Sequence, residues 1–267
     1  MKSTGKYSSV KETLDQQLHQ LKNTDFIPQD PISVPHTFSQ KQDIEIVGLF
    51  AAVFAWGLRK TIINKSFQLA NLMDNAPYDF ILHHQEKDLS RFSTFVHRTF
   101  NSDDTLHFIR FLQFWYRQNE SLETAFSQFI TPQSPHIEAA LCGFYDLFFS
   151  LPHLPRTRRH ISTPAKKASC KRLCMYLRWM VRTDAEGIDF GLWKRISPAQ
   201  LVCPLDVHVF RVAQDLQLLP LSARNNWEAA LVLTEHLRTF APADPVKYDL
   251  ALFSLGVQRK KQPFVIP

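Results

Sequence analysis

The chain has 267 residues, 45% of them hydrophobic, so it can bury a substantial core in one large domain or two packed lobes. Only seven glycines accompany 22 phenylalanines and five tryptophans, a composition that favours helices with bulky buried faces over sheets. The polar N-terminal segment, the absence of a membrane-length apolar run and the four cysteines argue against a secretory signal, a membrane span and a disulfide framework, so we expect a cytoplasmic protein.

The net charge of +6 is concentrated in one stretch of the chain. Residues 151–195 contain eleven Lys and Arg but only three Asp and Glu, a local charge of +8 that leaves −2 for the rest. A localised excess of this kind is expected where a protein contacts a polyanion such as DNA. A helix face that is merely solvated would give the same pattern, and this alternative stays open.

Apolar periodicity and capping residues predict helices in the first half of the chain. We expect an amphipathic helix from about Val10 to Lys22, followed by an extended proline-rich connector, FIPQDPISVPH. Asp43 is the expected N-cap of a buried helix that ends near Gly57. Further helices are expected over about 61–73 and from Pro77, Ser102, Ser121 and Ser134 onwards.

A basic, proline-containing segment, LPHLPRTRRHISTPAKKAS, interrupts this series and predicts a loop between lobes or paired helices. The last helix is expected to close at Gly256, and no segment has a convincing strand pattern. The sequence therefore predicts an all-α protein. The expected caps of the later helices are Ser169, Ser197, Asp206, Asn225 or Asn226, and Asp244.

The helix predicted from Ser169 to Arg182 has two opposite faces. Its apolar residues share one side, whereas Arg178 and Arg182 each lie within about 20° of Lys171 on the other. We expect the apolar side to pack on the core and the other side to present three cations. The candidate nucleic-acid contacts are Lys166, Lys167, Arg172, Arg178 and Arg182.

The string VCPLDVHVFRVAQDL, which contains Asp206, resembles the segment of helix-hairpin-helix (HhH-GPD) DNA glycosylases that carries their essential aspartate. It is most similar in motif to the 8-oxoguanine glycosylases. SCKRLCMYLRWMVR resembles their second hairpin helix, with Lys171 at the place of the lysine found in lyase-competent members, and DIEIVGLFAAVFAW resembles their early buried helix. The resemblance covers roughly residues 43–256 and implies a two-lobed helical fold of this type.

Within one HhH-GPD-like domain spanning residues 1–267, we expect a helical sublobe of residues 44–165. A second sublobe, of residues 1–43 and 166–267, would carry the candidate site. The combination of SxCKR, LRWMVR, DFGLW, PLDxHV and DPVKYDLALFSLGV is also similar to an uncharacterised bacterial family, the domain of unknown function 2400. Membership there implies little about activity by itself.

The chain departs from the glycosylase pattern in three respects. The hairpin STPAKKAS has no glycine, although backbone N–H groups approach a phosphate there in the known enzymes, so Lys166 and Lys167 would have to act as point charges. Lys171 and Asp206 lie 35 residues apart, farther than in endonuclease III, with TDAEGIDFGLWKRISPAQL as the apparent insertion. No cysteine cluster follows Gly256, so we expect no iron–sulfur cluster and no other cofactor.

The resemblance implies excision of a base that is flipped out of the stack. Asp206, held anionic at a helix N-terminus, would stabilise positive charge on the sugar and could also deprotonate an attacking amine. A desolvated Lys171 among other cations would have a lowered pKa and could attack the sugar to form a Schiff base, whose β-elimination nicks the strand. Phe190 and Trp193 are candidates to sandwich the flipped base, although core packing explains them at least as well.

We therefore expect a DNA glycosylase, with or without lyase activity, that acts as a monomer on duplex DNA carrying a damaged base such as an oxidised purine. Two other functions stay open: a catalytically inactive nucleic-acid-binding module of the same fold, and a helical scaffold for protein partners. A zinc site of Cys170 and Cys174 with Cys203 or His208 lacks a second close pair of ligands, so we expect no metal.

Overall fold

The computed structural model describes residues 3–21 and 27–259, and in these ranges all regular structure is helical. Two isolated bridges, His97–Phe100 and Thr183–Phe190, are the strand-like pairings of the described residues. The prediction of an all-α protein is confirmed. The α-helices are α1 (Ser3–Leu21), α2 (Lys41–Phe54), α3 (Arg59–Leu72), α4 (Pro77–His83), α5 (Ser102–Tyr116), α6 (Glu123–Ser127), α7 (Glu138–Phe148), α8 (Lys171–Val181), α9 (Val207–Asp215), α10 (Trp227–Phe240) and α11 (Asp249–Arg259).

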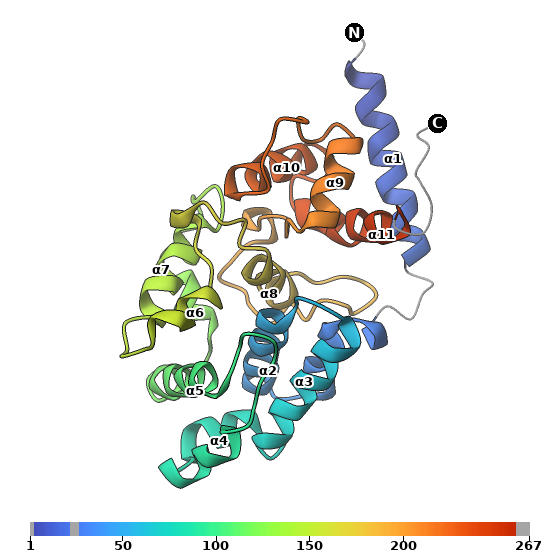
Figure 1. Ribbon diagram of the computed structural model, residues 1–267. Helices are drawn as coiled ribbons and strands as arrows, with labels where there is room; N and C mark the ends of the chain where they lie inside the picture. The colour runs from blue at the N-terminus through green and yellow to red at the C-terminus, as the bar shows by residue number, and fades with distance from the viewer. Residues whose placement is uncertain (1–2, 22–26, 260–267) are drawn as a thin grey trace.

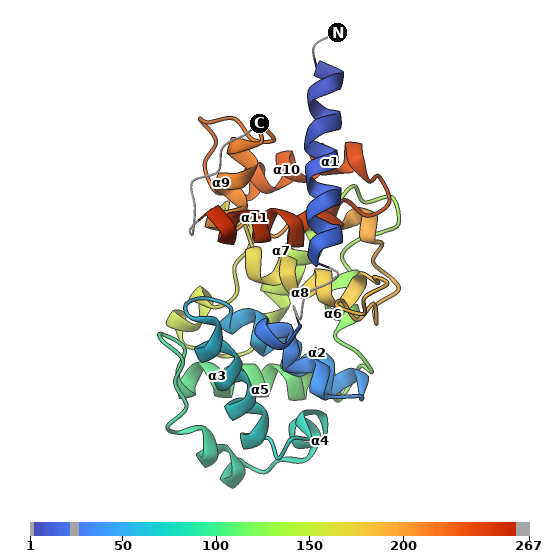
Figure 2. The same cartoon turned by 90° about the vertical axis from the view of Figure 1, so that its right-hand side faces the viewer.

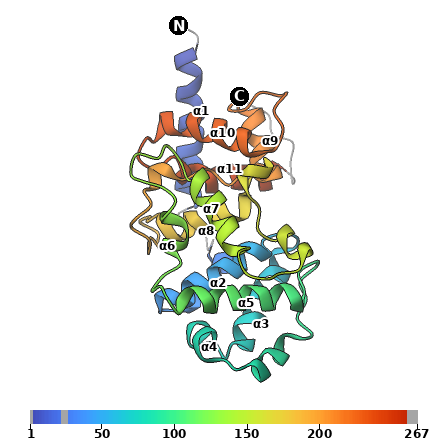
Figure 3. The same ribbon diagram turned by 90° about the vertical axis from the view of Figure 1, so that its left-hand side faces the viewer.

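Helix α8 lies at the centre of the molecule, between two groups of helices (Figure 1). Helices α2 to α5 form the group on one side, and α9, α10 and α11 with the long α1 form the group on the other. Figures 2 and 3 show the same order from two further sides, with α6 and α7 beside α8. The chain therefore returns to its middle layer after the basic segment, and α8 contacts α2 directly.

The expected division into sublobes of residues 44–165 and of residues 1–43 with 166–267 stays a prediction. Near its first boundary, the segment expected to be an extended connector instead forms three 3-10 turns, η1 (Ile27–Gln29), η2 (Pro31–Ser33) and η3 (Pro35–Thr37). Turns η2 and η3 pack on α2. The prolines therefore start short helical turns here, because the fixed φ of proline suits the first position of such a turn.

Several expected helix ends are confirmed. Asp206 is the N-cap of α9, and Asn226 is the N-cap of α10. Ser197 caps the short turn η7 (Pro198–Gln200) through a capping box with Gln200. The first helix also exists, and it starts earlier than Val10; its expected end at Lys22 lies outside the described residues.

Other expected helix ends are wrong by a few residues. Helix α5 is capped by Asn101 instead of Ser102, because the Asn101 and Asp104 side chains bond each other's backbone N–H groups. Asp43 lies inside the first turn of α2, where it accepts a hydrogen bond from the Tyr78 backbone N–H at 2.7 Å. Further shifts move the start of α7 from Ser134 to Glu138, that of α8 from Ser169 to Lys171, and the last helix past Gly256.

Glu45 is a fully buried carboxylate that ties α2 to three other segments. Its oxygens accept hydrogen bonds from the Tyr116 hydroxyl at 2.8 Å and from the Trp193 indole N–H at 2.7 Å. The Leu122 backbone N–H donates to it at 3.0 Å, and the Ser121 hydroxyl also donates to it. A buried carboxyl group is tolerated when its acceptor sites are filled in this way, so Glu45 holds α5, the α5–α6 connection and the 183–196 segment against α2.

Helices α9 and α11 cross closely because α11 has a glycine at the crossing. A Cβ atom added at Gly256 would lie 2.8 Å from Cβ of His208 and 3.2 Å from the His208 backbone. Gly256 is therefore a packing residue within α11 rather than the end of that helix. The close crossing fixes the start of α9, which carries Asp206, against the body of α11.

We expect Gly256→Ala to destabilise the protein by about 1–3 kcal/mol, because the added methyl group overpacks the crossing. A loss of stability would identify the close crossing as the cause, because a change from glycine to alanine in an open helix interior stabilises a protein by roughly 1 kcal/mol. Urea unfolding of both proteins measures the difference. Gly48→Ala is the control: its nearest neighbour is the end of the flexible Met180 side chain at 3.0 Å, so its loss should be smaller. A stabilised Gly256→Ala protein would contradict the packing role.

Candidate functional site

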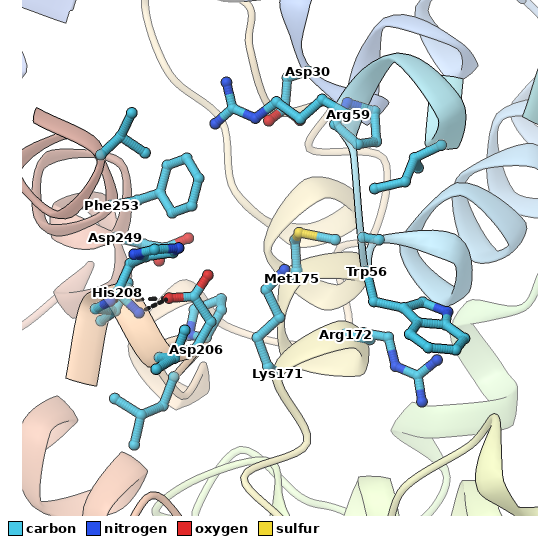
Figure 4. Close-up of a pocket in the computed structure, with 18 of the residues that line it drawn as sticks. Asp30, Trp56, Arg59, Lys171, Arg172, Met175, Asp206, His208, Asp249 and Phe253 are labelled. Carbon is cyan, nitrogen blue, oxygen red and sulfur yellow. Dashed lines mark hydrogen bonds between the residues drawn. The ribbon is translucent and has the colours of Figure 1, made fainter. Parts of the chain in front are cut away.

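A cavity of about 770 Å³ opens beside α8, between the two groups of helices. Its walls come from the α2–α3 connection, the start of α8, the start of α9 and the inner face of α11 (Figure 4). This volume lies within the range of roughly 300–1,000 Å³ that is usual for ligand pockets. Lys171 and Asp206, the two residues singled out as a reactive pair, both line it.

Lys171 is the first residue of α8, and its half-buried side chain lies on the cavity wall. Burial lowers the pKa of its amine below the ordinary value of lysine. The negative charges of Asp206, Asp249 and Asp30 act in the opposite direction, whereas the neighbouring Arg172 adds to the lowering. The amine is therefore closer to its neutral, nucleophilic form than a surface lysine would be.

Asp206 precedes α9 and points into the cavity from the side facing Lys171 (Figure 4). One carboxylate oxygen accepts hydrogen bonds from two backbone N–H groups, that of His208 at 2.7 Å and that of Val209 at 2.9 Å. Two backbone donors and the positive end of the helix dipole stabilise a negative charge at this position. Asp206 can therefore present a fixed anion to the interior of the cavity.

A second carboxylate of the cavity, Asp249, was not foreseen from the sequence. It is the first residue of α11 and only 5% exposed, and its Oδ2 accepts a hydrogen bond from Nη1 of Arg178 at 2.5 Å. Burial raises the pKa of Asp249 to about 6, although the Arg178 guanidinium and the Lys171 amine oppose this rise. Its position within DPVKYDLALFSLGV belonged to the family pattern, but no spacing connected it to Lys171.

Arg178 and Arg182 lie on the expected side of α8, but they do not face solvent. They are 3% and 6% exposed and form a chain of buried ion pairs. Nε of Arg178 donates to Asp189 at 3.2 Å, Arg182 also binds Asp189, and Nε of Arg182 donates to Asp244 at 2.8 Å. The expectation that these two arginines contact nucleic acid is corrected, because acidic residues of the 183–196 segment and of the C-terminal region already hold them.

The aromatic candidates also need correction. Trp193 is 1% exposed, and its indole N–H is bonded to Glu45 in the core. Phe190 packs on the His36 ring, with centroids 4.3 Å apart, and its backbone N–H bonds to the carbonyl of Trp179. Neither side chain is among the residues that line the cavity, so neither can sandwich a ligand there.

Other apolar side chains line the cavity in their place. Trp56 follows α2, Met175 lies one turn along α8 from Lys171, and Phe253 lies one turn along α11 from Asp249 (Figure 4). The Arg59 guanidinium carbon lies 4.9 Å from the Phe253 ring centroid and so bridges the two sides of the cavity. Trp56 ends the string DIEIVGLFAAVFAW, which was interpreted as a buried helix, and this hid its role as a wall residue.

The remaining basic candidates differ in what they contact. Arg172 is a bridge within the protein, since it donates to the Val53 carbonyl at 2.8 Å and to the Arg159 carbonyl at 3.1 Å. Nζ of Lys166 donates to the Tyr145 hydroxyl at 3.0 Å. Lys167 is exposed and has a left-handed backbone, with φ of 58°. Arg158 and Arg159, in the turn η5 (Pro155–Arg159), are exposed as well.

Within the described residues, no group of three or more His, Cys, Asp or Glu is placed to hold a metal ion. Cys170, Cys174 and Cys203 are buried free thiols, and burial raises the pKa of each, that of Cys170 to about 12. Deprotonation, which zinc binding requires, is therefore disfavoured at all three. Among the helices of the same residues, none is long and apolar enough to cross a membrane.

We expect Arg178→Met to destabilise the protein by about 3–5 kcal/mol at neutral pH, because Asp189 and Asp249 are then left as buried anions without this partner. Burial already raises the pKa of both carboxyls, and removal of the cation raises it further. A carboxyl whose pKa is raised by folding costs stability only while it is ionised, that is, above its folded pKa.

The loss should therefore shrink as the pH falls from about 7.5 to about 5, because the carboxyls become protonated. Urea unfolding at several pH values measures this dependence. Arg211→Met, at an exposed position of α9, is the control and should stay within about 0.5 kcal/mol of the parent. A loss that did not change with pH would contradict the ion-pair assignment.

Comparison with known proteins adds one positive finding. Searches of curated proteins and of solved structures found no significant match. The model of one protein family, described as "Protein of unknown function (DUF2400)", matches residues 30–258, which include the ion-pair chain and all four walls of the cavity. This match covers most of the chain, and the protein therefore belongs to the DUF2400 family.

Proposed function

We propose that this protein is a DNA glycosylase with an associated lyase activity, built on a fold of the helix-hairpin-helix glycosylase type. The observation that carries the proposal is the single cavity lined by both Lys171 and Asp206, which come from segments 35 residues apart. A desolvated amine facing a fixed carboxylate is the combination that covalent base excision requires.

In this proposal, Lys171 is the nucleophile. Its neutral amine attacks C1′ of the sugar, the bond between C1′ and the base nitrogen breaks, and the electron pair of that bond leaves with the base. Opening of the sugar ring then gives a protonated Schiff base between Lys171 and the DNA. Loss of a proton from C2′ and departure of the 3′ phosphate complete the β-elimination, which nicks the strand.

Asp206 would stabilise the positive charge that develops on the sugar as the base leaves. Its hydrogen bonds to the backbone of α9 hold it in one orientation, so no reorganisation is needed when the charge appears. A fixed anion beside the sugar, and not a mobile one, is the arrangement that electrostatic catalysis favours.

The apolar side chains of the cavity suit a flat, extrahelical base. Trp56, Met175 and Phe253 line it from three different elements, and bases stack well on aromatic and thioether groups. We assign base contact to Met175 and Phe253 in place of Phe190 and Trp193, because the Trp56 ring is already covered by Arg98, whose guanidinium carbon lies 4.5 Å from the ring centroid. Oxidised purines stay the substrate class of first choice, with uracil and abasic sites as the alternatives to be compared.

The hairpin before α8 has a backbone that suits contact with DNA although it lacks glycine. Lys167 and Cys170 both have positive φ, 58° and 52°, a region that glycine normally supplies. Strained residues of this kind persist where the surroundings hold them, and here the Trp227 backbone N–H bonds to the Lys167 carbonyl at 3.3 Å. We propose that this turn, with the exposed Arg158 and Arg159, contacts the phosphate backbone.

The rival proposal is a catalytically inactive module that binds nucleic acid with the same surface. The commitment of Lys166 to the Tyr145 hydroxyl favours it, because one of the two expected phosphate contacts of the hairpin is then engaged within the protein. Both proposals expect salt-sensitive binding to DNA. They differ in whether Lys171 becomes attached to the DNA.

We expect borohydride to trap a covalent complex between the wild-type protein and a duplex that carries 8-oxoguanine, uracil or an abasic site. Lys171→Gln should abolish the adduct, because no other amine replaces the nucleophile, and should leave DNA affinity within about threefold. Asp206→Asn should slow trapping roughly 100-fold or more. Denaturing gels measure the adduct. If the protein bound all three duplexes but formed no adduct with any of them, the glycosylase proposal would fail and the inactive binding module would be supported.

We expect Arg159→Gln combined with Lys167→Gln to weaken binding to undamaged duplex and to lower the slope of log K against log salt by about 2, roughly 0.9 for each lost phosphate contact. Fluorescence anisotropy at several salt concentrations measures both. Lys87→Gln combined with Arg117→Gln removes the same charge from exposed positions of the α2–α5 group and should leave the slope unchanged. Equal slopes for the two pairs would contradict this assignment of the DNA-binding surface.

A further inference from the structure

The cavity holds two carboxylates in different environments, and this difference suggests different tasks. Asp206 lies at the N-terminus of α9, whereas Asp249 lies at the start of α11 beside Arg178. We propose that Asp249, positioned by Arg178, accepts the proton that the Lys171 amine must lose before it attacks, while Asp206 serves as the fixed group beside the sugar. This inference rests on the proposed function of the cavity and assigns it a second functional carboxylate.

The arrangement of the three groups supports this assignment. Lys171, Asp206 and Asp249 come from α8, α9 and α11 and line the same cavity. The charge of Lys171 is coupled to both carboxylates, since each raises the pKa of the amine. In turn, the charge of Asp206 raises the pKa of Asp249, whereas the charge of Lys171 lowers it. The three groups therefore form one electrostatically coupled cluster on the wall of the cavity.

The surroundings make Asp249 the better acceptor of the two carboxylates. One oxygen of Asp206 is already occupied by hydrogen bonds from two backbone N–H groups. Asp249 is enclosed in the protein, where burial raises its pKa to about 6. A buried carboxyl beside the amine is suited to acid–base work, whereas a carboxylate held by backbone donors is suited to serve as a fixed anion.

The proton transfer is balanced within the cluster. The proton leaves Nζ of Lys171 and binds an oxygen of Asp249, which gives a neutral amine and a neutral acid and leaves the charge of Asp206 unchanged. The acid can later return this proton to the departing base nitrogen, which carries the electron pair of the broken bond. Asp249 is then ionised again for the next turnover.

Asp249 must be ionised to accept a proton, so the activity should fall as the pH drops through about 6. Charged and titratable groups from several elements surround Asp249. Lys171 and Arg178 face it from α8, Asp206 from the start of α9, and Asp189 acts through Arg178. The charge of Asp30 raises the pKa of Lys171 and of Arg178. The charge of Asp249 raises the pKa of the Cys174 and Cys203 thiols, and His208 lines the same cavity.

Two measurements on Asp249→Asn test the proposal. Single-turnover borohydride trapping should slow roughly 100-fold or more, because the internal proton acceptor is gone. Acetylation of Lys171 by acetic anhydride, followed by mass spectrometry of its peptide in the absence of DNA, should become several-fold faster at neutral pH. The reason is that loss of the Asp249 charge lowers the pKa of the amine further. A purely electrostatic role for Asp249 would speed both reactions, because the amine of the variant would be neutral more often.

Asp244→Asn is the matched control, because Asp244 belongs to the same ion-pair chain through Arg182 but does not line the cavity. Both of its rates should stay within about threefold of the parent. Unchanged trapping by Asp249→Asn would overturn the proposal. If that variant failed to fold, wild-type trapping that stayed flat between about pH 5 and pH 7 would overturn it instead.

The failure of the proposed function has a different signature. In that case the wild-type protein gives no adduct on any of the damaged duplexes, whereas acetylation still reports on the charge coupling. If the acetylation rate of Lys171 were then the same in Asp249→Asn and in the parent, the proton-acceptor assignment would fail together with the proposed function. Faster acetylation of the variant would preserve the coupled Lys171–Asp249 pair and direct the search to another electrophile.

Discussion

The guanidinium of Arg178 is the contact on which the geometry of the site depends. It binds Asp189 from the 183–196 segment and Asp249 from α11, and all three side chains are almost fully buried. A buried cation is expensive unless several partners satisfy it, and two carboxylates do so here. Through them, the helix that carries Lys171 is fixed to the helix that carries Asp249. The 183–196 segment, which looked like an insertion, therefore supplies one of the two carboxylates, Asp189, that hold Arg178.

Sequence patterns predicted the helical class, most of the helices and the pairing of Lys171 with Asp206 as candidates. Such features depend on local signals: apolar periodicity, capping residues and short motifs. The prediction that one side of α8 presents three cations is met only in part, because Arg178 and Arg182 are buried in ion pairs. Helical periodicity placed Arg178 and Arg182 on the correct side of α8. Their carboxylate partners lie as far as 71 residues along the chain, and no local signal identifies such pairs.

The aromatic residues illustrate the same limit. Trp193 and Phe190 were conspicuous because they stand close together in the insertion, yet the fold uses them for packing on Glu45 and on His36. Trp56 and Phe253 looked like ordinary members of buried helices, yet each ends up on the cavity wall. Apolar side chains at helical spacing do not reveal which of them face a cavity, because that depends on how distant helices meet.

The close crossing at Gly256 has a consequence for motion. Since a Cβ atom at Gly256 would collide with His208, the start of α9 packs directly on α11, and this crossing joins the walls of the cavity that carry Asp206 and Asp249. The facing wall comes from the α2–α3 connection, and the Arg59 side chain extends from the start of α3 to the Phe253 ring. A bulky molecule that filled the whole cavity would therefore have to displace the Arg59 side chain before it displaced either helix.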